Sequence, residues 1–313
     1  MKIVYLDSLA MGDDIDLTIF EQFGEFVKYE TSTTEEAALR TIDADIVLTN
    51  KVVINDATVG QAKNLKLVCV TATGTDNLDK DYLDGRGIGW RNVAGYSSNS
   101  VAQVTVTMLL YLMTNCRYYD DYVKNGDYIE SPIFTNLDHK FFELNGKTWG
   151  IIALGAIGRQ VAKIASAFGC KVIYYDVNRY DQDAQLGYEY VSLDTLLSSS
   201  DVVSIHAPLT DETRNLINKD TLAKMKSKSY LINVARGPII NEQDLADALN
   251  NNEIAGAGLD VLTVEPMLPA NPLRNVKDGS KLFIAPHIGW GSVEARTELI
   301  RLVVENIKTY FEL

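Results

Sequence analysis

The chain has 313 residues, 46% of them hydrophobic and 23% charged, which is enough apolar content for about two packed domains and argues against disorder. The formal net charge of −13 argues against nucleic acid or an anionic membrane as the main partner, because both would repel the protein. Cys69, Cys116 and Cys170 form no C-x-x-C pair. We therefore predict neither a disulfide framework nor a metal site. A protein with three unpaired cysteines is expected in a reducing compartment.

The first six residues, Met-Lys-Ile-Val-Tyr-Leu, already read as a strand and leave no room for a charged segment followed by an apolar one. We therefore expect a cytoplasmic protein. Residues 101–113 are rich in apolar side chains, but this stretch is too short to cross about 30 Å of hydrocarbon. It is predicted to be a buried or interfacial helix.

Short apolar runs alternate with helical patterns from the N-terminus, an order typical of α/β proteins with parallel sheets. A first series of strands is predicted at residues 3–6, 26–29, 46–48 and 67–70. A long helix is then predicted from Asn99 to about Lys124. A second series of strands is predicted at residues 148–154, 171–176, 201–206, 229–234, 255–261 and 281–285.

The last segment, residues 293–311, has apolar residues at helical spacing and no strand after it. We predict that this helix returns to the first domain. Ligands of two-domain α/β proteins bind where the carboxyl ends of the strands meet. The functional site is therefore expected in a cleft between the domains.

A glycine-punctuated turn follows the first strand of the second series, in the run Gly-Ile-Ile-Ala-Leu-Gly-Ala-Ile-Gly from Gly150 to Gly158. This pattern, with Asp176 at the end of the next strand, is typical of a dinucleotide-binding βαβ unit. Backbone groups of Gly155, Ala156 and Ile157 would face a pyrophosphate, and Asp176 would accept hydrogen bonds from a ribose.

Ala153 occupies the place of the first glycine of the usual G-x-G-x-x-G motif. If this turn needs a positive φ, alanine is strained there by about 1 kcal/mol. The alternative interpretation is a tight strand-to-helix connection that binds no ligand, which would also contain Gly155 and Gly158. The position of Asp176, 18 residues after Gly158, favours the cofactor interpretation.

Three side chains that follow predicted strands form a candidate catalytic set: Arg236, Glu265 and His287. Taken singly, an arginine such as Arg236 is more often part of a surface ion pair, and a glutamate such as Glu265 is more often a solvated carboxylate. A single histidine such as His287 is more often structural. Together they suit hydride transfer to a 2-keto acid, because arginine grips a carboxylate in two places and an imidazolium protonates the new alkoxide. Glu265, bonded to one ring nitrogen, would favour the charged histidine and fix its ring.

Several runs resemble the D-isomer-specific 2-hydroxyacid dehydrogenase family. They are Asn-Val-Ala-Arg-Gly at 233–237, Gly-Leu-Asp-Val at 258–261, Glu-Pro at 265–266 and Pro-His-Ile at 286–288, with Ala-Thr-Gly-Thr-Asp-Asn at 72–77 and His-Ala-Pro-Leu-Thr at 206–210. The similarity covers nearly the whole chain. It implies two Rossmann-like domains with a discontinuous substrate domain (residues 1–98 and 288–313) and an NAD-binding domain (residues 99–287).

The resemblance also implies roles for individual residues. Arg236 would bind substrate, Glu265 would partner the histidine, and His287 would be the acid/base. Thr73, Gly74 and Thr75 would hold the substrate carboxylate. Cofactor contacts are implied for Gln103, Ala207, Pro208, Ala235 and Asp260, with Asp260 meeting the nicotinamide carboxamide. Family members are usually dimers, with arms that correspond to residues 99–142.

Within the family, residues 49–51, 95–97 and 288–290 most resemble the glycerate dehydrogenase (hydroxypyruvate reductase) branch. D-lactate and aromatic or branched D-2-hydroxyacid dehydrogenases remain alternatives, as does a catalytically weak NAD(H)-sensing protein. Asp176 favours NAD over NADP because a carboxylate repels a 2′-phosphate. Arg179 could weaken that preference if it turned toward the ribose.

Overall fold

A computed structural model describes residues 1–177 and 187–313, which form two compact units. Unit 1 comprises Met1–Ser97 and Trp290–Leu313, and unit 2 comprises Ser98–Gly289. Every strand pairing in both units is parallel. The α/β order predicted from the alternating apolar runs is therefore confirmed. The prediction for Arg179 lies outside the described residues.

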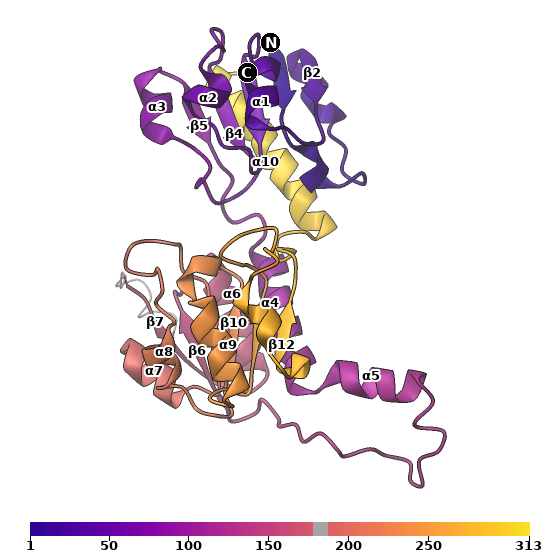
Figure 1. The fold of residues 1–313 in the computed structure, drawn as a ribbon. Helices are drawn as coiled ribbons and strands as arrows, with labels where there is room; N and C mark the ends of the chain where they lie inside the picture. The colour runs from indigo at the N-terminus through magenta and orange to yellow at the C-terminus, as the bar shows by residue number, and fades with distance from the viewer. Residues whose placement is uncertain (178–186) are drawn as a thin grey trace. The chain divides into compact units, whose positions relative to one another are not determined.

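Unit 1 is a five-stranded sheet in the order β2-β1-β3-β4-β5. Its strands are β1 (Lys2–Tyr5), β2 (Glu25–Lys28), β3 (Ile46–Thr49), β4 (Leu67–Val70) and β5 (Gly89–Arg91). Its helices are η1 (Ser8–Met11), η2 (Thr18–Phe23), α1 (Thr34–Arg40), α2 (Asp56–Val59), α3 (Lys80–Gly85) and α10 (Val293–Phe311). The C-terminal helix α10 packs Leu299, Val303 and Ile307 into a core shared with the strands, and Figure 1 shows this helix, in yellow, lying beside them.

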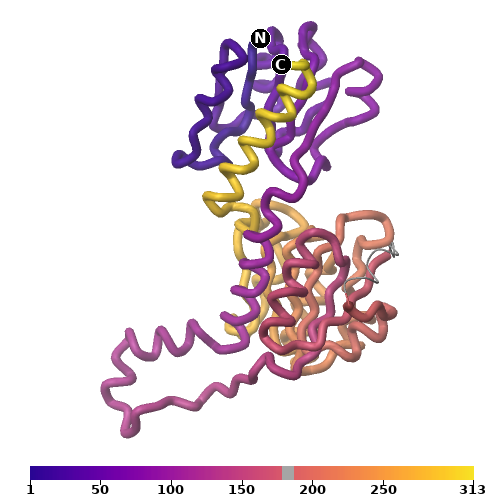
Figure 2. Tube along the Cα trace, turned by 180° about the vertical axis from the view of Figure 1, so that it is seen from behind, coloured from indigo at the N-terminus to yellow at the C-terminus, as the bar shows by residue number. Residues whose placement is uncertain are grey.

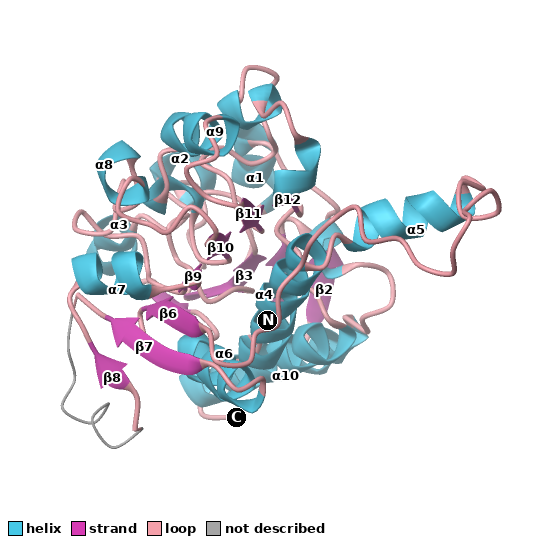
Figure 3. Cartoon of the chain, turned by 90° about the horizontal axis from the view of Figure 1, so that it is seen from below, coloured by secondary structure: helices cyan, strands magenta, loops and turns pink. Residues whose placement is uncertain are grey.

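Unit 2 is a seven-stranded sheet in the order β12-β11-β10-β9-β6-β7-β8, which Figure 3 shows from below. Its strands are β6 (Thr148–Ile152), β7 (Lys171–Tyr175), β8 (Glu189–Tyr190), β9 (Val202–Ile205), β10 (Tyr230–Asn233), β11 (Gly256–Leu259) and β12 (Leu282–Ile284). Its α-helices are α4 (Ser98–Met113), α5 (Cys116–Lys124), α6 (Ala156–Ala167), α7 (Leu193–Ser199), α8 (Lys219–Leu222) and α9 (Glu242–Asn250). Short 3-10 helices are η4 (Gly237–Ile239), η5 (Pro272–Asn275) and η6 (Gly279–Lys281).

The prediction of one continuous helix from Asn99 to about Lys124 is wrong, because two helices, α4 and α5, occupy this stretch. Asn115 has φ 52, in the left-handed region, and it separates α4 from α5. An asparagine adopts this conformation more readily than other non-glycine residues, which is why the chain turns there. After the break, α5 and the loop that follows extend away from the sheet of unit 2 (Figures 1 and 2).

The two strands that the apolar pattern missed are β5 and β8, of three and two residues. Both lie at an edge of their sheet, so neither needs the apolar run that a central strand buries on two faces. The helix α4, predicted to be buried, does bury Val101, Met108 and Leu109. Within the described ranges, no helix is long and apolar enough to cross a membrane.

Candidate active site

The sheet order of unit 2 arranges the predicted site residues in one row. Because all strands are parallel, their carboxyl ends share one edge, and the residues after β12, β11 and β10 include His287, Glu265 and Arg236. The residues after β9, β6 and β7 include Ala207, Gly155 and Asp176. The chain order reverses between β9 and β6, which is the position where open α/β sheets bind ligands. One half of this edge thus holds the catalytic candidates, together with the cofactor candidates Ala235 and Asp260, and the other half holds Ala207, Gly155 and Asp176.

The glycine-punctuated turn joins β6 to α6 with open space above it. A Cβ added to Gly155 would have no atom within 4 Å, whereas one added to Gly158 would lie 2.3 Å from the Ala153 carbonyl oxygen. Gly158 therefore lets the helix pack closely against the strand, and Gly155 leaves room for a ligand. Ala153 has φ 71, so the positive φ considered from the sequence is present and alanine is strained there.

The amino end of α6 suits an anion. This helix has 12 residues, and its N-cap, Gly155, supplies no side-chain hydrogen bond to the first turn. The exposed backbone N–H groups and the positive end of the helix dipole form an anion site. Gly155, Ala156 and Ile157 thus fit the pyrophosphate of a dinucleotide.

Asp176 directly follows β7 and reaches the same turn. Its carboxylate accepts a hydrogen bond from the Leu154 backbone N–H at 3.2 Å. The carboxylate is thereby held beside the turn that would bind the pyrophosphate. This position fits the recognition of a ribose attached to that pyrophosphate.

The turn after β10 is shaped by Asn233, which the sequence analysis did not single out. Its buried side chain accepts a hydrogen bond from the Ala235 N–H at 3.0 Å and donates one to the Arg236 carbonyl oxygen at 2.9 Å. The Arg236 guanidinium donates to the Ala235 carbonyl oxygen at 2.8 Å. Asparagine at the end of a strand is the local signal for such a turn, because its short amide side chain bonds neighbouring backbone groups.

Gly237 brings the turn after β10 against the turn after β11. A Cβ at this position would lie 1.9 Å from the backbone carbon of Leu262, a distance that no side chain tolerates. The Leu262 N–H in turn donates to Glu265 at 2.8 Å. Glycine at 237 is therefore required for the loop that carries Arg236 to pack against the loop that carries Glu265.

Glu265 and His287 form a direct pair. His287 Nδ1 lies 2.7 Å from Glu265 Oε2, and the two side chains are 25% and 32% exposed. Because one ring nitrogen is engaged by the carboxylate, Nε2 is left as the nitrogen that can exchange a proton with a ligand. The pairing predicted from the sequence is present in the geometry.

His287 is held by backbone contacts in an unusual conformation. It has φ 55, and its N–H donates to the carbonyl oxygens of Asp260, at 2.9 Å, and Ala285, at 3.0 Å. The next two amides, of Ile288 and Gly289, donate to the two carboxylate oxygens of Asp260, both at 2.8 Å. Asp260 is 2% exposed. Burial raises the pKa of Asp260, an effect that its hydrogen bonds from Gly289 and Ile288 and the nearby His287 oppose.

Comparison with known proteins shows the family of this chain. The family model for the NAD-binding domain of D-isomer specific 2-hydroxyacid dehydrogenases matches residues 106–289. A hydroxypyruvate reductase from Blautia hydrogenotrophica is 38% identical over 316 residues, covering 100% of this chain and 97% of its own. The chain belongs to the D-isomer specific 2-hydroxyacid dehydrogenase family.

Solved structures of this dehydrogenase family share the fold over the whole chain. A D-lactate dehydrogenase from Aquifex aeolicus, complexed with NAD and lactic acid, has a TM-score of 0.84 and 27% identity, covering 100% of this chain and 97% of its own. An NADPH-dependent glyoxylate/hydroxypyruvate reductase from Sinorhizobium meliloti, in complex with NADP and malonate, has a TM-score of 0.83 and 26% identity, covering 99% and 93%. The predictions of the family, its glycerate and hydroxypyruvate branch and two Rossmann-like domains are therefore confirmed.

Three further predicted cofactor residues of this dehydrogenase lie after β9 and on α4 of unit 2. Ala207 is buried and Pro208 exposed, just after β9, and the Thr213 hydroxyl donates to the Pro208 carbonyl oxygen at 2.7 Å. Gln103 is exposed on α4. The contacts of these residues with a cofactor stay a prediction, as does that of Asp260 with a carboxamide.

The predicted substrate residues of unit 1 form a loop after β4. The Thr73 hydroxyl donates to the Val93 carbonyl oxygen at 2.9 Å, and the Asn92 amide donates to the Thr73 carbonyl oxygen at 2.6 Å. Gly74 and Thr75 follow, both partly exposed. This loop lies at the carboxyl edge of the first sheet, as expected from its place after a parallel strand.

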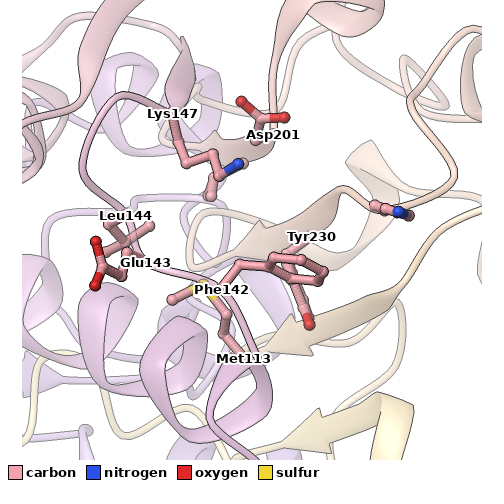
Figure 4. A pocket seen from close by; sticks show the side chains of 9 residues that line it. Met113, Phe142, Glu143, Leu144, Lys147, Asp201 and Tyr230 are labelled. Atoms are coloured by element: carbon pink, nitrogen blue, oxygen red, sulfur yellow. The ribbon is translucent and has the colours of Figure 1, made fainter. Parts of the chain in front are cut away.

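A cavity of about 160 Å³ lies at the opposite, amino edge of the unit 2 sheet (Figure 4). It is lined by residues that precede or begin strands, such as Lys147, Asp201 and Tyr230, together with Met113 and Phe142. None of the predicted site residues lines it. This cavity is therefore separate from the candidate site at the carboxyl edge.

Proposed function

We propose that this dehydrogenase reduces hydroxypyruvate or glyoxylate to D-glycerate or glycolate with NADH, and that the reaction is reversible. The observation that carries the proposal is the Glu265–His287 pair beside the Arg236 turn, on the same sheet edge as the Gly155 turn and Asp176. The high identity to a hydroxypyruvate reductase supports the choice of substrate.

The proposed mechanism divides the work among three side chains. A nicotinamide cofactor, held by the Gly155 turn and Asp176, would supply the hydride for the carbonyl carbon. The Arg236 guanidinium binds the substrate carboxylate and carbonyl oxygen, since its fork matches a planar anion. His287 Nε2 donates the proton to the new alkoxide oxygen, and Glu265 orients the imidazole ring through Nδ1.

We further propose that unit 1 is the substrate domain and unit 2 the cofactor domain. The backbone N–H groups of Thr73, Gly74 and Thr75 would hold the substrate carboxylate. Asp260 would accept a hydrogen bond from the nicotinamide carboxamide, and Gln103, Ala207, Pro208 and Ala235 would line the rest of the cofactor.

NAD is the proposed cofactor because Asp176 follows the second strand of the βαβ unit. A carboxylate there accepts hydrogen bonds from a 2′-hydroxyl and repels a 2′-phosphate. Substitution of Asp176 by serine should improve the use of NADPH relative to NADH. Unchanged selectivity in this variant would count against NAD.

The test of function is the loss of NADH absorbance with hydroxypyruvate, glyoxylate, pyruvate, phenylpyruvate and 2-ketoisocaproate, with NADPH in parallel. Hydroxypyruvate or glyoxylate should give the highest kcat/KM. A preference for pyruvate or for the larger keto acids would assign the chain to a lactate-type or aromatic branch. Tight NADH binding without turnover of any keto acid would favour an NAD(H)-sensing protein.

We also propose a cytoplasmic homodimer. The segment that extends from unit 2 exposes large apolar side chains, with Ile129 82%, Phe134 88% and Leu137 74% accessible. Covering them with a second copy would remove this apolar area from water. Light scattering coupled to size-exclusion chromatography should give twice the mass of the chain. Cell fractionation should place the protein with the soluble cytoplasmic fraction.

A further inference from the structure

Asp7, two residues after the end of β1 in unit 1, accepts three backbone hydrogen bonds from one loop. The Asn50 N–H donates to one carboxylate oxygen at 2.7 Å. The N–H groups of Lys51 and Val52 donate to the other oxygen at 2.6 and 3.1 Å. Since β1 and β3 are neighbours in the sheet, this carboxylate ties the loop after β3 to the end of β1.

That loop is connected at two points to the loop after β4. The Asn50 side-chain amide donates to the Thr71 carbonyl oxygen at 2.8 Å. The Asn77 side-chain amide donates to the Val52 carbonyl oxygen at 3.0 Å. Thr71 and Asn77 stand on either side of residues 73–75. The segment proposed to bind the substrate carboxylate is thus held at both ends by the loop that Asp7 fixes.

The buried end of this network leaves little room for it to rearrange. Asn50 is 4% exposed and Thr71 is fully buried, and the Thr71 hydroxyl lies 2.9 Å from the hydroxyl of Tyr5, which is also fully buried. Buried polar groups keep their partners because leaving one unpaired is costly. A displacement of residues 50–52 is therefore transmitted to Thr71 instead of being absorbed by loose packing.

We propose that Asp7 is a positioning residue for the substrate-binding loop, acting through residues 50–52 on residues 73–75. This inference rests on the proposed function, because it takes residues 73–75 to bind the substrate carboxylate. An aspartate suits the role because its two oxygens only accept hydrogen bonds, so three N–H groups can converge on it.

The test is Asp7→Asn, which keeps the shape of the side chain but places an amide N–H₂ where an oxygen accepted. The matched control is Asp45→Asn. Asp45 is a partly buried aspartate at the amino end of β3, where its carboxylate accepts the Lys2 N–H at 2.8 Å. Both variants remove a carboxylate that joins the same two strands, but only Asp7 touches the loop at the carboxyl edge.

For Asp7→Asn we expect the KM for hydroxypyruvate to rise about tenfold, with a smaller change in kcat and an unchanged Kd for NADH, since a lost charge-assisted hydrogen bond displaces the loop. Hydrogen exchange should quicken at residues 50–52 and 73–77. Asp45→Asn should leave both the KM and this exchange pattern as in the parent. An unchanged KM in Asp7→Asn, or an equal rise in the control, would overturn the proposal.

Two further measurements test the role of Asp7 if the Asp7→Asn variant does not fold or if the parent protein is inactive. If Asp7→Asn does not fold, Asn77→Ala removes one of the two links between the loops and should raise the KM in the same direction; no rise would reject the transmission through residues 50–52. If the parent protein turns over no keto acid, the proposed function fails. The exchange data then still decide whether Asp7 holds residues 73–77.

Discussion

The turn after β6 and the turn after β12 lie at the same edge of the unit 2 sheet and share a feature that is rare for residues other than glycine. Ala153 has φ 71 and His287 has φ 55. The amides that follow Ala153 lead into the uncapped first turn of α6, with open space at Gly155. The amides that follow His287 are both bonded to Asp260. One strained turn thus leads into a helix end with open space beside it, whereas the other uses its donors to fix a side chain.

A strained backbone residue at a sheet edge can therefore accompany different structural roles. A residue in the left-handed region costs about 1–2 kcal/mol and persists only where the surroundings determine it. Around His287 the determining partner is a buried carboxylate from the neighbouring strand. Around Ala153 it is the close approach of the helix at Gly158. Substitutions at the two turns separate these two uses.

The largest effect is expected at the fixed turn. His287→Ala should lower kcat by about two to four orders of magnitude, because it removes the positioned proton donor. The Kd for NADH, measured by fluorescence, should stay nearly unchanged, since the cofactor turn is elsewhere on the edge. Full turnover in this variant would remove His287 from the acid/base role.

Asp260→Asn should destabilise the protein by about 1–3 kcal/mol, because one of the two amides bonded to Asp260 loses its acceptor. Chemical denaturation measures this change. We also expect kcat to fall, since the conformation of His287 depends on these bonds. A variant as stable as the parent would show that the bonds to Ile288 and Gly289 do not hold the turn.

The pH dependence of this stability has a defined sign. Burial raises the folded-state pKa of Asp260 above its unfolded value, so the folded protein binds this proton more tightly. The contribution of Asp260 to the free energy of unfolding is fully present below the pKa of this group in the unfolded state. It declines as the pH rises through the raised pKa of the folded state. The difference in the free energy of unfolding between the parent and Asp260→Asn should therefore decrease as the pH rises from the unfolded-state pKa to the folded-state pKa of Asp260. A difference that widens would contradict the assignment.

Two glycine substitutions compare the turns directly. Gly155→Ala meets no atom and should leave the unfolding free energy within about 0.5 kcal/mol, yet weaken NADH binding by about tenfold because the methyl group would occupy the pyrophosphate position. Gly289→Ala places a Cβ 2.7 Å from Asp260 Oδ2 and should destabilise the fold by about 1–3 kcal/mol. Equal loss of stability in both variants would abolish the distinction between the turns.

The smallest effect concerns Ala153→Gly. Glycine relieves the positive φ but loses a buried methyl group and adds unfolded-state entropy, so the gain in stability should be about 0.5 kcal/mol. A small rise in melting temperature with unchanged kcat would fit. A marked loss of stability would mean that Ala153 matters for packing more than for backbone conformation.

Local patterns in the sequence determined the elements and the order of the site. Apolar runs located ten strands, because a buried strand needs consecutive apolar residues whatever surrounds it. The glycine spacing with Asp176 indicated a candidate cofactor turn, and Ala153 indicated its strain, since both depend on residues close in the chain. Arg236, Glu265 and His287 were recognisable because each follows a strand and all match one family pattern.

The tertiary structure alone decided which partners these residues have. The Asp260 bonds to Ile288 and Gly289 join residues 28 and 29 positions apart, and those of Asp7 to the loop after β3 span 43 to 45 positions. No local periodicity encodes such pairs. The same holds for the contact of Gly237 with Leu262, and for the break at Asn115, where an apolar pattern continued but the backbone turned. A sequence pattern specifies which face of an element is buried, whereas the packing of neighbouring strands decides which buried groups meet.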